Sequence, residues 1–207
     1  GETLASKEFA TAAGDKIPNG DMSGWSKRIW LDASNGEYPI TYPNPEGVKL
    51  WDSGNNAFLE QYNEDGTPKL FTPLCREDET EAGTAILSAQ MVMSFVFAPG
   101  NMFTGDFNYT GLSGTVNFGK PYAWTARPRA LKVRYKAQVG KIDKVGSNDP
   151  DGASYKDKQD RARIFVAVVD WTAQHGVTSG MTAPTGMWDP ATMNSVDEGA
   201  ILGYGDL

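Results

Sequence analysis

Alternation of apolar and polar residues with a period of two is the feature that most constrains the fold of this chain. The clearest run is RALKVRYKAQVG, whose apolar positions are Leu131, Val133, Tyr135, Ala137 and Val139. Lysine, arginine and glutamine occupy the positions between them. Because successive side chains of a strand point to opposite faces, the run predicts a strand with its apolar residues in the core and its cations in water.

Other segments give the same indication of strands. Residues 84–94 alternate in a similar way, and RARIFVAVVDW is apolar on both faces around Val166 and Val168, which predicts a central strand with both faces covered. No convincing helical stripe appears, and residues 189–197 predict at most one or two helical turns. The three prolines in residues 37–47 predict an extended loop.

These patterns predict an all-β fold, an antiparallel β-sandwich with a jelly-roll-like topology similar to carbohydrate-binding modules. An immunoglobulin-like sandwich is the open alternative, because periodicity does not separate the two. The 23 glycines and 12 prolines predict many turns between short strands. We expect one sandwich domain over residues 19–207, and an N-terminal arm or incoming strand over residues 1–18.

Charge and composition exclude several functions. The formal net charge of −7 argues against a nucleic-acid partner, since phosphate binding needs a basic surface. No apolar stretch approaches the roughly 20 residues that span a bilayer, so we expect no membrane insertion by this segment. The lone Cys75 predicts a buried free thiol, and the lone His175 predicts a solvated loop histidine. We expect no cofactor.

The segment VKLWDSGNNAFLEQY sets an apolar run against short polar residues, and two interpretations compete. In the structural one, Trp51 packs at a strand end while Asp52 or Asn55 caps a turn through its own backbone. In the functional one, the tryptophan ring stacks on the C–H face of a sugar, and the short polar groups bind its hydroxyls. The first interpretation is favoured, and both can hold together.

A second loop, GKPYAWTARPR, offers another aromatic and polar combination. Tyr122 and Trp124 form a candidate sugar-binding shelf with Arg127 as a cationic partner. Burial of these rings beneath the loop is the alternative, since most aromatic residues belong to the core. Together the carbohydrate-binding candidates are Trp51, Asp52, Asn55, Tyr122, Trp124 and Arg127.

Carboxylates near Gly152 raise the question of calcium. An EF-hand alignment that puts Gly152 at the sixth position places Lys158 where a bidentate glutamate is required, so that motif fails. A looser structural calcium site remains a weak hypothesis, with Asp21, Asp149 and Asp151 as its candidate ligands. A solvated hairpin loop is the default interpretation of this segment.

An ordered series of motifs resembles a known family. The motifs are NGDMSGW (19–25), LWDSGNN (50–56), AGTAILSAQ (82–90), NMFTGDF (101–107), NFGKPYAWTARPRALKVRYKA (117–137) and RIFVAVVDW (163–171). Each motif is weak by itself, but in this order they resemble the putative carbohydrate metabolism domain (PCMD) family of gut Bacteroidetes. The resemblance implies a secreted or cell-surface jelly-roll domain, on the envelope or outer membrane, with a glycan as its partner. It also implies further C-terminal strands, so we expect this chain to be truncated at its C-terminus.

Three functions follow from these observations as hypotheses. The first is a non-catalytic carbohydrate-recognition or adhesion module on the bacterial cell envelope. The second is a glycan-active hydrolase that uses paired carboxylates, although none of the 26 acidic residues is singled out as catalytic. The third is a structural spacer that displays another domain.

Overall fold

The structure is a computed structural model of the 207-residue chain. It describes residues 16–31, 37–57, 64–65, 72–92, 94–110, 113–122, 131–146 and 149–207. These residues form short antiparallel strands with a single α-helical turn, α1 (Gly152–Tyr155). The all-β class predicted from the alternation is therefore confirmed. In the described part of the chain, no helix is long and apolar enough to cross a membrane.

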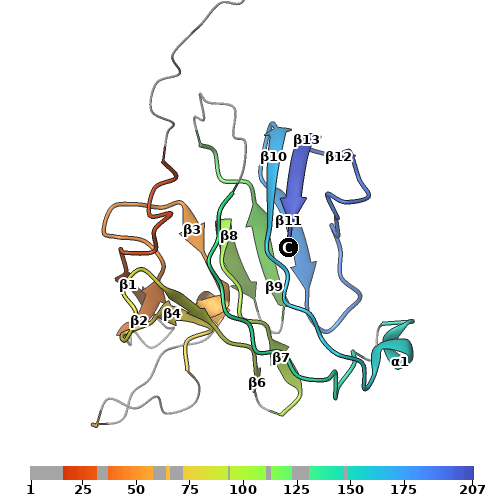
Figure 1. Cartoon of the computed structure of the whole chain (residues 1–207), viewed down its shortest axis with the longest axis horizontal. Coiled ribbons are helices and arrows are strands. Elements are labelled where there is room, and N and C mark those ends of the chain that lie inside the picture. Colours follow the sequence, from red (N-terminus) through yellow and green to blue (C-terminus); the bar gives the residue numbers. More distant parts are fainter. Residues whose placement is uncertain are drawn as a thin grey trace, which may run out of the picture.

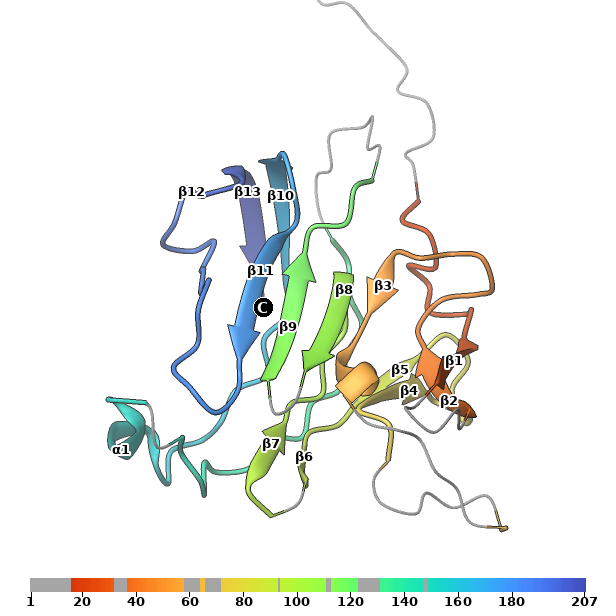
Figure 2. The same ribbon diagram turned by 180° about the vertical axis from the view of Figure 1, so that it is seen from behind.

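A four-stranded sheet forms the centre of the fold. Its strand order is β11 (His175–Ser179), β9 (Ser113–Phe118), β8 (Phe103–Thr110) and β3 (Trp51–Asp52). Figure 2 shows these strands side by side. β8 and β9 form a hairpin in which Gly105 lies opposite Phe118. β3 pairs with β8 over two residues only, so most of that edge of β8 is left to other groups.

A three-stranded sheet lies against the first. β13 (Gly199–Asp206) pairs antiparallel with β10 (Phe165–Trp171) on one side and with the short β12 (Ser195–Val196) on the other. The register between β10 and β13 shifts between Val168 and Val169, which marks a bulge. Figures 1 and 2 show β10 and β13 on one face of the four-stranded sheet, so the two sheets form separate layers.

Aromatic side chains fill the space between the layers. Trp188, from the segment between β11 and β12, is the hub, with its ring centroid 5.7 Å from Phe118, 5.8 Å from Phe165 and 5.2 Å from Trp171. All three contacts are edge-on, the geometry that the ring quadrupoles favour. Because Phe118 belongs to one sheet and Phe165 and Trp171 to the other, this aromatic cluster is the sandwich core.

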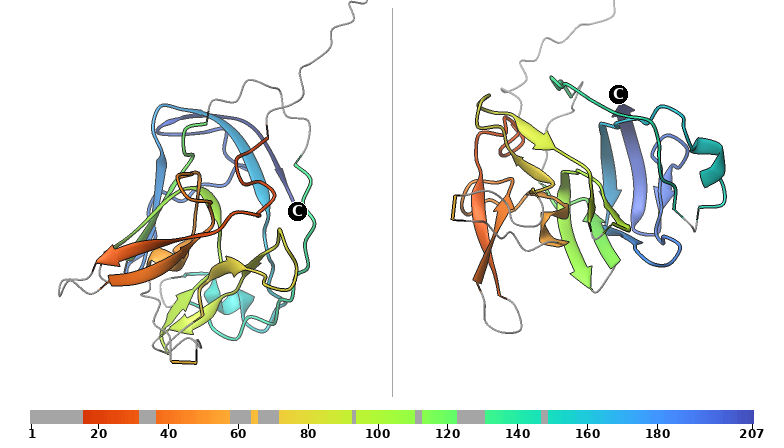
Figure 3. Two further views of the ribbon diagram at one scale, coloured as in Figure 1. Left: turned by 90° about the vertical axis from the view of Figure 1, so that its left-hand side faces the viewer. Right: turned by 90° about the horizontal axis from the view of Figure 1, so that it is seen from below.

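Three hairpins surround the end of the four-stranded sheet near β3. They pair β1 (Ser26–Leu31) with β2 (Glu37–Tyr42), β4 (Cys75–Glu77) with β5 (Ala85–Leu87), and β6 (Gln90–Val92) with β7 (Val96–Ala98). Figure 3 shows the β1–β2 hairpin and the β6–β7 hairpin as separate projections. Fully buried apolar side chains lie here, comprising Ile40, Tyr42, Leu50, Leu74 and Cys75, whereas the rings of the aromatic cluster are half-buried.

The prediction of a core-facing strand at residues 131–139 is wrong. These residues are not in a strand and form the blue-green coil that leads toward α1 in Figure 1. Leu131, Val133 and Tyr135 are 46%, 41% and 56% exposed. Alternation of apolar and polar residues indicates that a segment is suited to a strand. A strand forms only where the edge of a neighbouring strand supplies hydrogen bonds. In the structure, the only bridge described for this region joins Lys141 to Gln159.

The prediction that β10 is a central strand with both faces covered is also wrong. Among the described residues β10 pairs only with β13, and Val168 is exposed while Val166 is half-buried. The face of β10 that is covered carries Phe165 and Trp171, which reach the aromatic cluster. Val166 and Val168 therefore belong to the outer face of a sheet at this edge.

Smaller differences concern the prolines and the predicted helical turns. Residues 37–42 form β2 rather than a loop, and Pro39 lies opposite Ile29 in the two-stranded sheet. Proline is tolerated there because an edge strand leaves alternate N–H positions unpaired. Residues 190–192 form turns rather than a helix, and β12 begins at Ser195. The predicted strand at residues 84–94 divides into β5 and β6, which lie in different sheets.

Trp188→Ala should destabilise the fold by about 3–5 kcal/mol, because it removes the ring on which both layers converge and leaves a cavity. Met187→Ala is the matched control, because the Met187 side chain is next in sequence and is 64% exposed. This substitution should change stability by less than about 0.5 kcal/mol. Urea unfolding of both variants measures the difference. Equal stability of the two variants would mean that Trp188 does not join the layers.

Gly119→Ala should destabilise by at least about 1–2 kcal/mol, as expected when a side chain is forced into left-handed backbone. Gly119 has φ +82°, and an added Cβ would lie 2.9 Å from Cε3 of Trp171. Gly140→Ala is the control, because a Cβ there has no atom within 4 Å. Thermal unfolding of the two variants provides the comparison. If Gly119→Ala melted like Gly140→Ala, the architectural role of Gly119 would be excluded.

Candidate functional site

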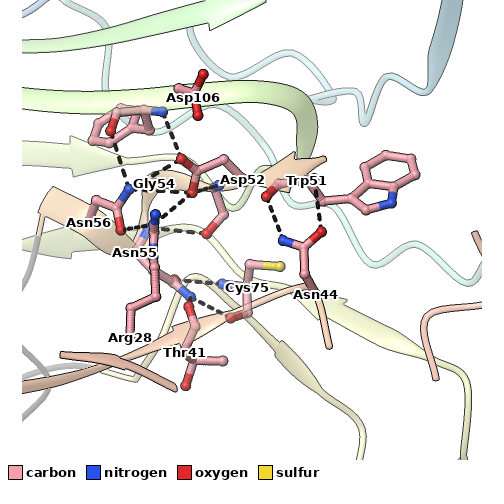
Figure 4. Close-up of polar contacts among 12 residues, drawn as sticks. Arg28, Thr41, Asn44, Trp51, Asp52, Gly54, Asn55, Asn56, Cys75 and Asp106 are labelled. Carbon is pink, nitrogen blue, oxygen red and sulfur yellow. Dashed lines mark hydrogen bonds and ion pairs between the residues drawn. The ribbon is translucent and has the colours of Figure 1, made fainter. Parts of the chain in front are cut away.

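The carboxylate of Asp52 lies at the end of β3 and is the centre of a buried polar network (Figure 4). Asp52 is 3% exposed. Its Oδ2 accepts a hydrogen bond from the backbone N–H of Phe107 at 2.8 Å, and its Oδ1 accepts one from the N–H of Ser53 at 2.9 Å. The Nδ2 group of Asn56 donates to both oxygens at 3.3 Å and to the carbonyl of Phe107 at 3.2 Å. Asp52 and Asn56 thus provide β8 with the contacts that a longer β3 would provide.

Two other asparagines bind backbone groups in the same manner. The Nδ2 of Asn55 donates to the carbonyls of Thr41 and Cys75 at 2.9 and 2.7 Å, and its Oδ1 accepts the N–H of Cys75 at 3.0 Å. Asn44, which is completely buried, donates to the carbonyl of Trp51 and accepts the N–H of Trp51. These bonds connect β2, β3 and β4, which share no strand pairing with one another in the described structure.

Arg28 connects this network to the surface. Its Nη2 donates to Oδ1 of Asn56 at 2.6 Å and to Oδ1 of Asp52 at 3.2 Å. Its Cζ lies 4.0 Å from the centroid of the Tyr42 ring, a cation–π geometry. Burial raises the pKa of the Asp52 carboxyl above its usual value, although the Phe107 N–H and Arg28 act in the opposite direction. Burial likewise raises the pKa of Tyr42.

A cleft of about 620 Å³ opens beside Arg28. β1 and β2 form one side, the loop after β2 forms the rim, and β8 with the segment after β9 forms the other side. The lining residues are Ser26, Lys27, Arg28, Tyr42, Pro45, Glu46, Gly47, Val48, Lys49, Asp106 and Lys120. The cleft is therefore built from segments that are far apart in the sequence.

Asp106 is one of the two carboxylates that line this cleft, with Glu46. Its Oδ1 accepts a hydrogen bond from Nζ of Lys120 at 2.5 Å, and its Oδ2 accepts one from Nε2 of Gln174 at 3.1 Å. Partial burial acts to raise the pKa of Asp106, but the hydrogen bonds from Lys120 and Gln174 outweigh it, so the pKa lies below its usual value. Asp106 is therefore a carboxylate at neutral pH and serves as a hydrogen-bond acceptor.

The sequence-predicted site residues have different surroundings. Asp52 and Asn55 are buried in the network, where they bind backbone groups of the protein. Trp51 is half-buried, and its Nε1 donates to the carbonyl of Pro18 at 2.9 Å. Tyr122 is 39% exposed, and its hydroxyl donates to the carbonyl of Lys16 at 2.9 Å. Trp124 and Arg127 lie outside the described residues.

Sequence reasoning did not select the residues that line the cleft. Lys49 and Lys120, which do line it, lie two residues before the aromatic candidates Trp51 and Tyr122. Arg28 and Asp106 occupy ordinary strand positions in β1 and β8, where a charged residue is expected on any solvated face. No local signal marks them, because their proximity depends on the tertiary fold.

The candidate calcium ligands bind neighbouring groups of the protein. Oδ1 of Asp21 accepts the hydroxyl and N–H of Ser23 at 2.9 and 3.3 Å, and the Ser23 hydroxyl lowers the pKa of Asp21. Oδ1 of Asp149 accepts the N–H of Asp151 at 2.9 Å. Within the described ranges, no three His, Cys, Asp or Glu side chains are grouped so that they could hold a metal ion.

The prediction that His175 is a solvated loop histidine is wrong. His175 begins β11 and is 8% exposed. Its Nδ1 lies 2.6 Å from Oε2 of Glu198 and its Nε2 lies 2.7 Å from the carbonyl of Gly186. The hydrogen bond with His175 lowers the pKa of Glu198. The centroid of the imidazole lies 5.5 Å from that of the Trp171 ring, so His175 packs against the aromatic cluster of the sandwich core.

Comparison with known protein families assigns residues 26–188 to the family model described as the putative carbohydrate metabolism domain. The chain belongs to this family. The PCMD match begins at β1 and ends at Trp188, so it includes every residue that lines the cleft and the hub of the sandwich core. The description of the PCMD family relates the domain to carbohydrates. No curated protein and no solved structure matches the chain.

Cys75 should react with thiol reagents only when the fold opens. It is 0% exposed beside the network, and burial raises the pKa of its thiol to about 12. Since the reactive species is the thiolate, labelling at pH 8 should be slow in buffer and immediate in urea. Because the pKa is higher folded than unfolded, the thiol's contribution to stability is complete below about pH 9 and is lost as the pH rises toward 12. Rapid labelling of the native protein would contradict the packing of β4 against Asn55.

Proposed function

We propose that this PCMD-family domain is a non-catalytic carbohydrate-recognition or adhesion module, and that its glycan binds in the cleft between β1–β2 and β8. The observation that carries the proposal is the cleft itself, which gathers acceptors and donors from Asp106, Lys120 and Ser26 on strands or beside them. Sugar hydroxyls bind such fixed polar groups, and sites on rigid elements hold their geometry better than sites on loops. Family membership supports the choice of a carbohydrate as the ligand.

Binding is favoured over hydrolysis by the state of the two carboxylates near Arg28. A glycosidase needs one carboxyl group that can deliver a proton and one that can attack the sugar or activate water. Asp52 is occupied by the N–H groups of Phe107 and Ser53, and Asp106 is occupied by Lys120 and Gln174. Both carboxylates therefore accept from internal donors, which suits a binding wall better than a reaction centre.

A glycan-active hydrolase is the second candidate, and one observation favours it. The pKa of Asp52 is raised by burial, while the pKa of Asp106 is lowered by its hydrogen-bond donors. Carboxylates whose environments shift their pKa values in opposite directions are the pattern of an acid and its partner. Release of reducing sugar from a polysaccharide panel, abolished by Asp106→Asn, would establish hydrolysis in place of recognition.

The aromatic candidates extend the proposed site. Tyr122 follows Lys120 by two residues and presents an exposed ring, and Trp124 and Arg127 continue the same segment of sequence. We place the ring that stacks on a sugar in this segment. We further propose a secreted or cell-envelope location, on the outer surface, where a glycan-binding domain meets polysaccharides. A spacer role is what would remain if no glycan binds.

Asp106→Asn and Lys120→Gln should each weaken glycan binding by about tenfold or more, because a hydrogen bond to a charged group contributes roughly 1.5–3 kcal/mol. Lys156→Gln is the matched control, since this exposed lysine follows α1 and is not part of the cleft lining. Polysaccharide pull-down followed by titration with the retained glycan measures the effect. Unchanged binding in both cleft variants, with melting temperatures equal to wild type, would remove the glycan from this cleft.

A further inference from the structure

Arg28 is held in one position from two directions. Asp52 and Asn56 bind its Nη2 from behind, and the Tyr42 ring supports the flat face of the guanidinium. Asp52 is itself fixed by backbone N–H groups of β8 and of the turn after β3. An arginine normally loses considerable side-chain entropy when it binds a ligand, so one that is already ordered loses less.

The guanidinium retains donors for a ligand. Within the described part of the chain, Nε and Nη1 of Arg28 make no hydrogen bond, and its side chain is 40% exposed at the cleft. Charge-assisted hydrogen bonds from these guanidinium N–H groups to a carboxylate are stronger than hydrogen bonds to neutral sugar hydroxyls. The covered Tyr42 ring, by contrast, offers no open face on which a neutral sugar could stack.

The charge of the cleft differs in sign from that of the chain. The lining holds four cations, Lys27, Arg28, Lys49 and Lys120, against the two carboxylates Glu46 and Asp106. With the buried Asp52 included, the cations still outnumber the carboxylates. The whole chain carries −7, so the cleft offers an anionic ligand a more favourable potential than the net charge of the chain implies.

We propose that the cleft binds an acidic sugar, and that a uronate carboxylate lies against the free N–H groups of Arg28. The inference rests on the proposed recognition function and names its ligand class. Arg28 is the residue that contacts the carboxylate, Lys49 and Lys120 contribute positive charge, and Asp52 with Asn56 are positioning residues. Affinity should therefore fall as salt concentration rises, because part of the attraction is Coulombic and exposed.

The test compares three oligosaccharides of equal length by calorimetric titration, namely an oligogalacturonide, a neutral galactose oligomer and a sulfated galactose oligomer. We expect the uronate to bind at least tenfold more tightly than the neutral oligomer and more tightly than the sulfated one. Arg28→Lys keeps the charge but loses the Nε and Nη1 donors of the guanidinium, and it should weaken uronate binding by tenfold or more. Lys49→Gln, at an exposed rim position, should weaken it severalfold and reduce its salt dependence.

The outcomes separate this inference from the function on which it rests. Equal affinity for the uronate and the neutral oligomer would overturn the acidic-sugar assignment and leave glycan recognition standing. Equal or tighter binding of the sulfated oligomer would overturn the carboxylate assignment, since charge alone would then select the ligand. If the protein bound none of the three oligosaccharides and no other polysaccharide, the proposed function itself would be overturned. If Arg28→Lys fails to fold, the uronate affinities of Lys49→Gln and Lys156→Gln are compared instead. Equal affinities of these two variants would overturn the acidic-sugar assignment.

Discussion

The burial of the Asp52 carboxylate is the constraint on which the β3 end of the fold depends. A charge in a nearly dry environment is tolerated only when hydrogen bonds and an opposite charge surround it. Here the N–H of Phe107, the N–H of Ser53, Asn56 and Arg28 surround it. These four partners come from three places in the chain, so the carboxylate determines how β8, the turn after β3 and β1 lie with respect to one another. Removing any partner leaves a buried charge incompletely compensated.

Asparagine side chains extend this principle to the rest of the region. Asn44 and Asn55 each bind a backbone carbonyl and a backbone N–H, so they act as short lengths of strand where the real strands have ended. This explains why a polar cluster lies among Ile40, Leu50 and Leu74, which are buried. Asp52 and Asn55 thus join segments of the fold, and the cleft lies beside them.

The fold class could be predicted from the sequence, because alternation and turn residues are local properties that an antiparallel sheet makes visible. The positions of individual segments could not. Leu131 and Val133 have the ideal pattern of a strand but pair with no strand among the described residues, whereas Pro39 lies in a strand that its own chemistry disfavours. His175 shows the same limit. The sequence around it resembles a solvated loop, and only the tertiary structure shows its contacts with Trp171 and Glu198. For the site, Asp52 and Asn55 could be recognised as special, but the meeting of Arg28 with Asp106 and Lys120 follows from long-range pairing alone.

The loop that forms the rim of the cleft has a consequence for how such domains diversify. Glu46, Gly47 and Lys49 are exposed, and a side chain at position 47 would meet no atom within 4 Å, although its φ of +81° favours glycine. The loop is anchored at its two ends, by Asn44 and by the turn in which Val48 N–H binds the carbonyl of Pro45. Substitutions at the rim therefore leave the buried network intact. The chemistry of the cleft rim can therefore change at these few positions without a change in the stability of the fold.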